Sequence, residues 1–84
     1  MGKHEEALSC CEQAITLDPN NGLAYFNKGN ALQGMGKYEE AIDCYDKSIS
    51  IYPSYPDTYY EKGNTLKAMG RKKKHWIATR NVFV

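Results

Sequence analysis

An all-α fold of stacked antiparallel helical hairpins is predicted by two features of the 84-residue sequence: an internal repeat and apolar side chains at helical spacing. The heptapeptide Met-Gly-Lys-Tyr-Glu-Glu-Ala at 35–41 occurs almost unchanged at 1–7, and its first three residues recur, with arginine for lysine, at 69–71. Superimposing residues 1–34 on 35–68 gives 14 identities. A period of this length is typical of repeat proteins, in which each unit buries the apolar face of its neighbour.

The central repeat carries the residue spacing of a known helix-turn-helix unit. Its marker residues are Tyr25, Gly29, Leu32, Ala41, Tyr45 and Pro53. This pattern closely resembles the tetratricopeptide repeat (TPR), and the resemblance covers about residues 1–71. One departure is Lys28, repeated as Lys62, where the pattern prefers leucine; a lysine can lay its methylene stem on the core and keep its ammonium in water. The resemblance implies a short right-handed TPR solenoid of four helices plus an irregular C-terminal segment.

The register of the repeat divides the predicted single TPR domain, residues 1–84, into four parts. The resemblance implies the second helix of a partial repeat at 1–21, a complete repeat at 22–55, the first helix of a next repeat at 56–71, and a divergent basic and apolar tail at 72–84. This start within a unit suggests a fragment of a longer repeat protein or a shortened gene product.

Helices are predicted at about 3–17, 23–35, 38–52 and 57–69 from apolar residues at three- and four-residue spacing. Proline, asparagine and glycine interrupt the chain between them at 18–22, 34–37 and 53–56, where they favour turns. After Arg71 the match to the repeat is lost: His75 stands where Ala41 stood, and Thr79 where Tyr45 stood. A histidine in place of that alanine would overpack the helix contact. We therefore expect a fifth, irregular helix, a loosely docked segment or disorder in the tail.

The composition points away from membrane spans and from catalysis. No run approaches the ~18 apolar residues of a transmembrane helix, and the N-terminus lacks the apolar core of a signal peptide, so a cytoplasmic location is expected. The three cysteines form no Cys-x-x-Cys pair, which argues against a zinc or redox site. We find no nucleophile elbow, phosphate-binding loop or pair of metal-spaced histidines. The sequence therefore predicts no enzyme activity, no catalytic residue, no metal and no cofactor.

The TPR resemblance implies protein–protein interaction, because the first helices of successive units line a concave groove that holds extended peptides. Carried over residue by residue, the groove would comprise Leu23, Phe26, Asn27, Asn30 and Gln33 of the second helix and Asp57, Tyr60, Glu61, Asn64 and Lys67 of the fourth. Asparagine amides supply both a donor and an acceptor to a peptide backbone. Asp57 and Glu61 would repel a terminal carboxylate, so we expect a neutral or basic peptide rather than the C-terminal tail of a chaperone. An alternative is that Asn30 and Asn64 serve local packing or solubility.

Two other kinds of partner are compatible with the sequence. A single complete repeat with two incomplete ones leaves an apolar strip bare at each end, and such strips favour self-association, by head-to-tail stacking or by exchange of helices. The alternative to peptide binding is thus a homo-oligomer. The basic run at 71–74 begins residues 71–84, which hold five basic residues and no acid, whereas residues 1–70 carry a net charge of −4 (six basic, ten acidic). Electrostatic binding of nucleic acid or an acidic partner through the tail is a further, weaker alternative, since no recognition helix or stacking platform accompanies it.

Overall fold

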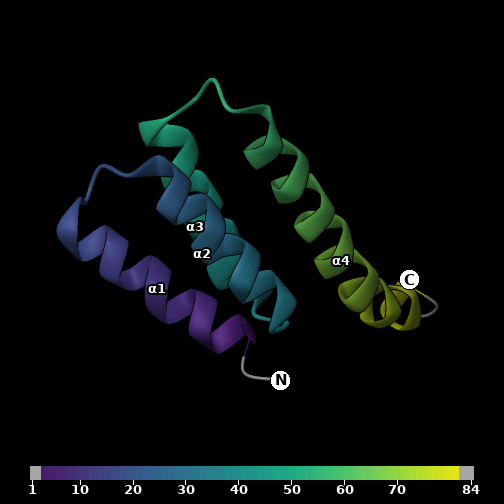
Figure 1. Ribbon diagram of the computed structural model, residues 1–84. Coiled ribbons are helices and arrows are strands. Elements are labelled where there is room, and N and C mark those ends of the chain that lie inside the picture. Colours follow the sequence, from purple (N-terminus) through teal and green to yellow (C-terminus); the bar gives the residue numbers. More distant parts are fainter. Residues whose placement is uncertain (1–2, 82–84) are drawn as a thin grey trace.

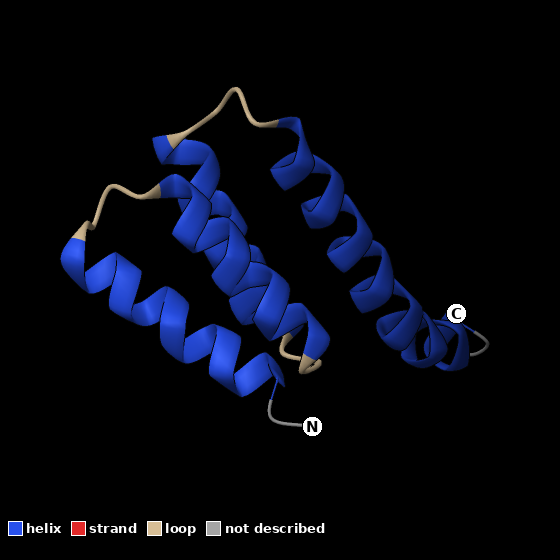
Figure 2. Ribbon diagram, viewed as in Figure 1, coloured by secondary structure: helices blue, strands red, loops and turns tan. Residues whose placement is uncertain are grey.

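Four helices follow one another in the computed structural model, which describes the backbone of residues 3–81 and the side chains of residues 3–70. They are α1 (Lys3–Leu17), α2 (Gly22–Gly34), α3 (Tyr38–Ile51) and α4 (Pro56–Asn81). Figure 1 shows α2 and α3 as a central pair, with α1 and α4 on opposite sides of it, and Figure 2 shows only helices and short loops in the described part of the chain. The predicted all-α hairpin repeat is confirmed.

The loops form where turn-favouring residues interrupt the helices. Asn21 caps α2 by accepting a hydrogen bond at its Oδ1 from the backbone N–H of Ala24, at 3.0 Å. The backbone N–H of Asn20 donates to the Asp18 carboxylate at 3.1 Å, which closes a side-chain turn just before this cap. Gly36 lies between α2 and α3 with a φ of +83°, a left-handed conformation that disfavours residues with a Cβ. The loops before and after α2 thus follow from local chemistry.

The core lies between α2 and α3, and its largest fully buried side chain is Tyr45. The Tyr45 ring occupies the space beside Gly29: a Cβ on that glycine would come within 2.5 Å of the ring. Two further buried apolar residues, Leu32 and Ala41, complete the contact between the helices. At the other end of the pair, the Ser48 hydroxyl donates to the carbonyl of Gly22 at 2.8 Å. Four of the six marker residues, Gly29, Leu32, Ala41 and Tyr45, therefore pair α2 with α3.

The predicted end of the fourth helix at Met69 is wrong, because α4 continues without a break through Gly70 to Asn81. Locally, Met69-Gly70-Arg71 is almost the same as the turn Met35-Gly36-Lys37. After Gly36, however, Ala41 and Tyr45 gain burial by folding back onto α2. The sequence after Gly70 has no equivalent apolar residues at these positions, and a glycine costs a continuing helix only about 1 kcal/mol. The predicted tail at 72–84 is therefore helical backbone as far as Asn81, while residues 82–84 lie outside the described part of the chain.

Ion pairs join the second helix of one unit to the first helix of the next unit: α1 to α2, and α3 to α4. The Lys28 ammonium lies 3.7 Å from the Glu12 carboxylate, and the Lys62 ammonium lies 2.5 Å from Asp46. Both partners of the second pair lie one repeat length after those of the first. The two lysines that depart from the repeat pattern are half-buried, with their ammonium groups held by these carboxylates. Lysine at these two positions, where the repeat pattern prefers leucine, thus adds an electrostatic contact between neighbouring units.

The ion pair between Lys62 and Asp46 is expected to contribute little to stability. Both side chains are substantially exposed, and exposed pairs are typically worth under about 1 kcal/mol. In a double-mutant cycle of Asp46→Ala and Lys62→Ala, we expect a coupling free energy of about 0.5 kcal/mol that falls as salt is added. Urea unfolding of the four proteins measures it. A coupling several times larger that does not respond to salt would instead place the pair in a desolvated environment.

Candidate functional site

Gln33 forms hydrogen bonds between α2 and α4, which are the first helices of two successive units. Its side-chain amide donates to the Thr65 hydroxyl at 2.6 Å and to the Glu61 carboxylate at 3.4 Å. Thr65 is fully buried and in turn donates to the backbone carbonyl of Glu61 at 2.8 Å. Gln33 and Glu61, both predicted to line the groove, therefore contact each other, and their polar groups hold the two helices side by side.

Phe26, also predicted as flat apolar surface for a peptide, belongs to the core. Its ring lies 6.0 Å from that of Tyr45 and makes an edge contact with Tyr55 at 5.2 Å between ring centroids. Tyr55 comes from the loop that leads into α4, so Phe26 is covered by the start of the next unit. The equivalent residue of α4, Tyr60, has no such cover and is 69% exposed. Repeat position alone thus does not decide whether such a residue is buried.

Asn30 is held in place by a buried partner. The Tyr45 hydroxyl donates to its Oδ1 at 2.6 Å. Burial, with a smaller effect of the Glu61 carboxylate, raises the pKa of Tyr45 to about 12, so this hydroxyl keeps its proton at neutral pH. An asparagine amide that accepts through its oxygen still has two N–H donors to offer. Asn30 is therefore a pre-oriented donor beside the core.

A hollow of about 430 Å³ lies between α1 and α2 and includes this amide. Its lining residues are His4, Ala7, Cys10, Cys11, Asn27, Asn30 and Ala31. Two of the ten predicted groove residues, Asn27 and Asn30, share it with a mostly apolar face of α1. The two cysteines and Ala7 of that face were not among the predicted groove residues. Their only signal in the sequence was their repeat equivalence to residues of α3.

The remaining predicted groove residues are all exposed. These are Leu23 on α2 and Asp57, Tyr60, Asn64 and Lys67 on α4. On α4, positions 57, 60, 64 and 67 follow each other at three- and four-residue spacing, so they share one side of the helix. The structure therefore leaves seven of the ten predicted residues, the half-buried Asn30 included, open to a partner. It assigns Phe26, Gln33 and Glu61 wholly or partly to contacts within the chain.

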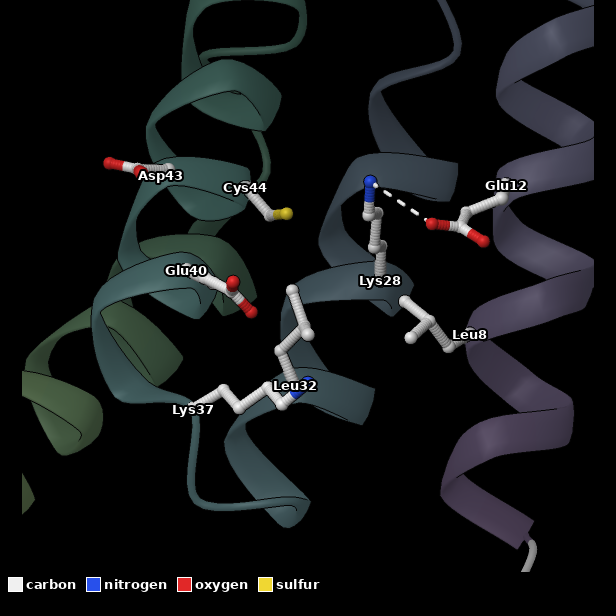
Figure 3. A pocket seen from close by; sticks show the side chains of 8 residues that line it. All are labelled: Leu8, Glu12, Lys28, Leu32, Lys37, Glu40, Asp43 and Cys44. Atoms are coloured by element: carbon white, nitrogen blue, oxygen red, sulfur yellow. Dashed lines mark ion pairs between the residues drawn. The ribbon is translucent and has the colours of Figure 1, made fainter.

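A second hollow of about 420 Å³ is formed by α1, α2 and α3 together (Figure 3). It is lined by Leu8, Glu12, Lys28, Leu32, Lys37, Glu40, Asp43 and Cys44. The Lys28–Glu12 ion pair lies at its α1 side, and the Cys44 thiol lies on α3 opposite. Burial raises the pKa of the Cys44 thiol, and likewise that of Cys11, so both stay protonated and weakly nucleophilic at neutral pH. The residues in this hollow form no catalytic arrangement.

The part of the chain that the structure describes has neither a cluster of metal ligands nor a membrane-spanning helix. No group of three or more histidine, cysteine or acidic side chains there is placed to hold a metal ion. None of the helices in this part combines the length and the apolar character needed to cross a membrane. The basic run at 71–74, a candidate for nucleic-acid or acidic partners, has its side chains outside the described residues.

Comparison with protein families agrees with the fold and with the residues that build it. Tetratricopeptide repeat models match residues 22–55 and 44–74, and a TPR repeat model matches residues 1–36. The chain belongs to the tetratricopeptide repeat family. A search of curated proteins found no match. Repeats of this family generally mediate protein–protein interactions and are not catalytic.

Proposed function

We propose that this protein binds an extended segment of a partner protein along the concave side of α2 and α4, with Asn30 and Asn64 as the anchors for the partner's backbone. The observation that carries the proposal is the hydrogen bond from the buried Tyr45 hydroxyl to Asn30. It fixes the amide without using its donors, and a fixed donor loses less side-chain entropy when it binds. Asn64 repeats Asn30 on α4, where its side chain is exposed.

The chemistry of the partner follows from the charges around these amides. Asp57 and Glu61 lie on the same helix as Asn64, and residues 1–70 carry a net charge of −4. An acidic peptide would be repelled here, whereas a neutral or basic one would not. The exposed Leu23 and Tyr60 offer apolar surface for its side chains. The proposed ligand is therefore an extended, neutral or basic peptide with apolar side chains.

Substitution of Asn64 by alanine tests this proposal. Decapeptides are selected from a random displayed library against the wild-type chain, and their dissociation constants are measured by fluorescence anisotropy. Loss of one or two hydrogen bonds is expected to weaken binding about three- to tenfold. Asn30→Asp should weaken neutral peptides similarly, because it keeps the acceptor for Tyr45 and removes the two donors.

Asn20→Ala is the matched control, since Asn20 is an exposed asparagine in the loop before α2. It should leave the dissociation constants unchanged. Peptides that bind Asn64→Ala and Asn30→Asp as tightly as the wild type would overturn the assignment of these anchors. A selected set rich in aspartate and glutamate would overturn the proposed peptide chemistry.

A further inference from the structure

One face of α4 is bare although its repeat equivalent on α2 is covered. Tyr59, Gly63 and Leu66 lie one repeat length after Tyr25, Gly29 and Leu32. Leu32 is 4% exposed beneath α3, whereas Leu66 is 49% exposed. A Cβ on Gly29 would collide with the Tyr45 ring, whereas a Cβ on Gly63 would have no neighbour within 4 Å. Within the part of the chain that the structure describes, the surface of α4 that would accept a second helix is thus uncovered.

The complementary face is bare on α1, which is the repeat equivalent of α3. Ala7 is exposed, while its equivalent Ala41 is fully buried between α2 and α3. Leu17 is 87% exposed, while its equivalent Ile51 is half-buried against the start of α2. Beside this face lies the hollow of about 430 Å³ between α1 and α2. A first helix placed there would contact both α1 and α2, as α2 contacts both α3 and α4.

We propose that copies of this chain associate head to tail, with α4 of one copy packed against α1 of the next in the way that α2 packs against α3. The register follows from the internal template: as Gly29 faces Tyr45, Gly63 would face Cys11 of the second copy, and Leu66 would lie near Ala7. The exposed Tyr60 and Lys67 would then extend toward the hollow, as Phe26 and Gln33 extend toward α4. One association completes one repeat and covers exposed apolar side chains of both copies.

Charge complementarity supports a second copy as the occupant. The first turn of α1 carries Glu5 and Glu6. In the proposed register it lies next to Gly70, where α4 continues as helix into the basic run Arg71-Lys72-Lys73-Lys74. The acidic first turn of one copy therefore lies beside the segment of the other copy's backbone whose sequence is basic. Opposite charges at such an interface favour the encounter and fix its register, and added salt screens them.

Light scattering on three single variants and one mixture tests this proposal. Gly63→Gln places a bulky side chain on the bare face of α4, and Ala7→Gln does the same on α1; both sites are open in the monomer, so neither change should unfold it. The wild type is expected to exceed its 9.5 kDa monomer mass as concentration rises a hundredfold, and to lose this excess at high salt. Each blocked variant should stay at the monomer mass. Ser9→Gln, on the exposed outer side of α1, should behave as the wild type.

Mixing the two blocked variants distinguishes head-to-tail pairing from a symmetric dimer. The Ala7→Gln copy retains an intact α4, and the Gly63→Gln copy retains an intact α1. Their equimolar mixture should therefore form dimers of twice the monomer mass that do not grow further. A wild type that is monomeric at every concentration, a blocked variant that still assembles, or a mixture that stays monomeric would overturn the proposal. Peptide binding by Asn30 and Asn64 is tested separately, at protein concentrations low enough for the chain to be monomeric, so failure of one proposal is distinguishable from failure of the other.

Discussion

Replacement of Tyr45 by alanine is expected to remove a large part of the free energy of unfolding. The side chain is fully buried, fills the space beside Gly29, and donates a hydrogen bond to Asn30. Removing a buried aromatic side chain costs about 3–5 kcal/mol. A chain of 84 residues has a total stability of only about 4–13 kcal/mol. Far-UV circular dichroism during urea unfolding would show a transition shifted to much lower urea, or no folded baseline.

Two further substitutions separate the contributions of the Tyr45 ring and hydroxyl. Tyr45→Phe keeps the ring and loses only the hydroxyl, so its expected cost is about 0.5–1.5 kcal/mol. Tyr60→Ala removes a tyrosine that is 69% exposed and should change the stability of the monomer by about 0.5 kcal/mol or less. Equal losses for Tyr45→Ala and Tyr60→Ala would contradict the placement of the core between α2 and α3.

Alanine at Gly29 and alanine at Gly63 are expected to have opposite effects, although the two glycines are repeat equivalents. At Gly29 the new Cβ would lie 2.5 Å from the Tyr45 ring, which is fully buried. Overpacking of this kind costs about 1–3 kcal/mol. At Gly63 the Cβ meets nothing within 4 Å, and alanine stabilises an exposed helix position by about 0.5–1 kcal/mol.

The sign of the effect at each glycine is measured by urea unfolding at concentrations where the protein is monomeric. Destabilisation by both substitutions would mean that a second helix covers Gly63 within the same molecule. Stabilisation by both would mean that α3 does not pack closely on Gly29. Only the arrangement described here gives a loss at one glycine and a gain at the other.

The sequence was sufficient to predict the elements whose ends are encoded locally. The helix at 3–17 was predicted with the bounds of α1, and those of α2 and α3 were predicted to within one residue. Their boundaries coincide with prolines, asparagines and glycines that act on the residues beside them. The end of α4 could not be predicted in this way, because Gly36 and Gly70 have nearly the same neighbours. The difference lies in whether the next segment gains burial by folding back.

The proposed binding surface was predictable only in part. The repeat register predicted Asn27, Asn30 and Asn64 for this surface, and the structure leaves all three open to a partner. Phe26 and Gln33 were predicted for this surface from the same repeat register. Their side chains instead contact the next unit: Phe26 packs on the Tyr55 ring, and Gln33 donates to the buried Thr65. A threonine at 65, where the preceding repeat has Ala31, gave no sequence signal of that contact.

The amino-acid sequence by itself determined the repeat, the helix types and the order in which they alternate, because these depend on residue spacing and on local turn chemistry. The tertiary structure decided which faces of those helices are covered. Burial of Leu32 and exposure of Leu66 arise from the presence of α3 against α2 and the absence, within the described residues, of an equivalent helix against α4. Burial is a property of neighbours distant in sequence, so identical repeat positions acquire different physical roles in the folded chain.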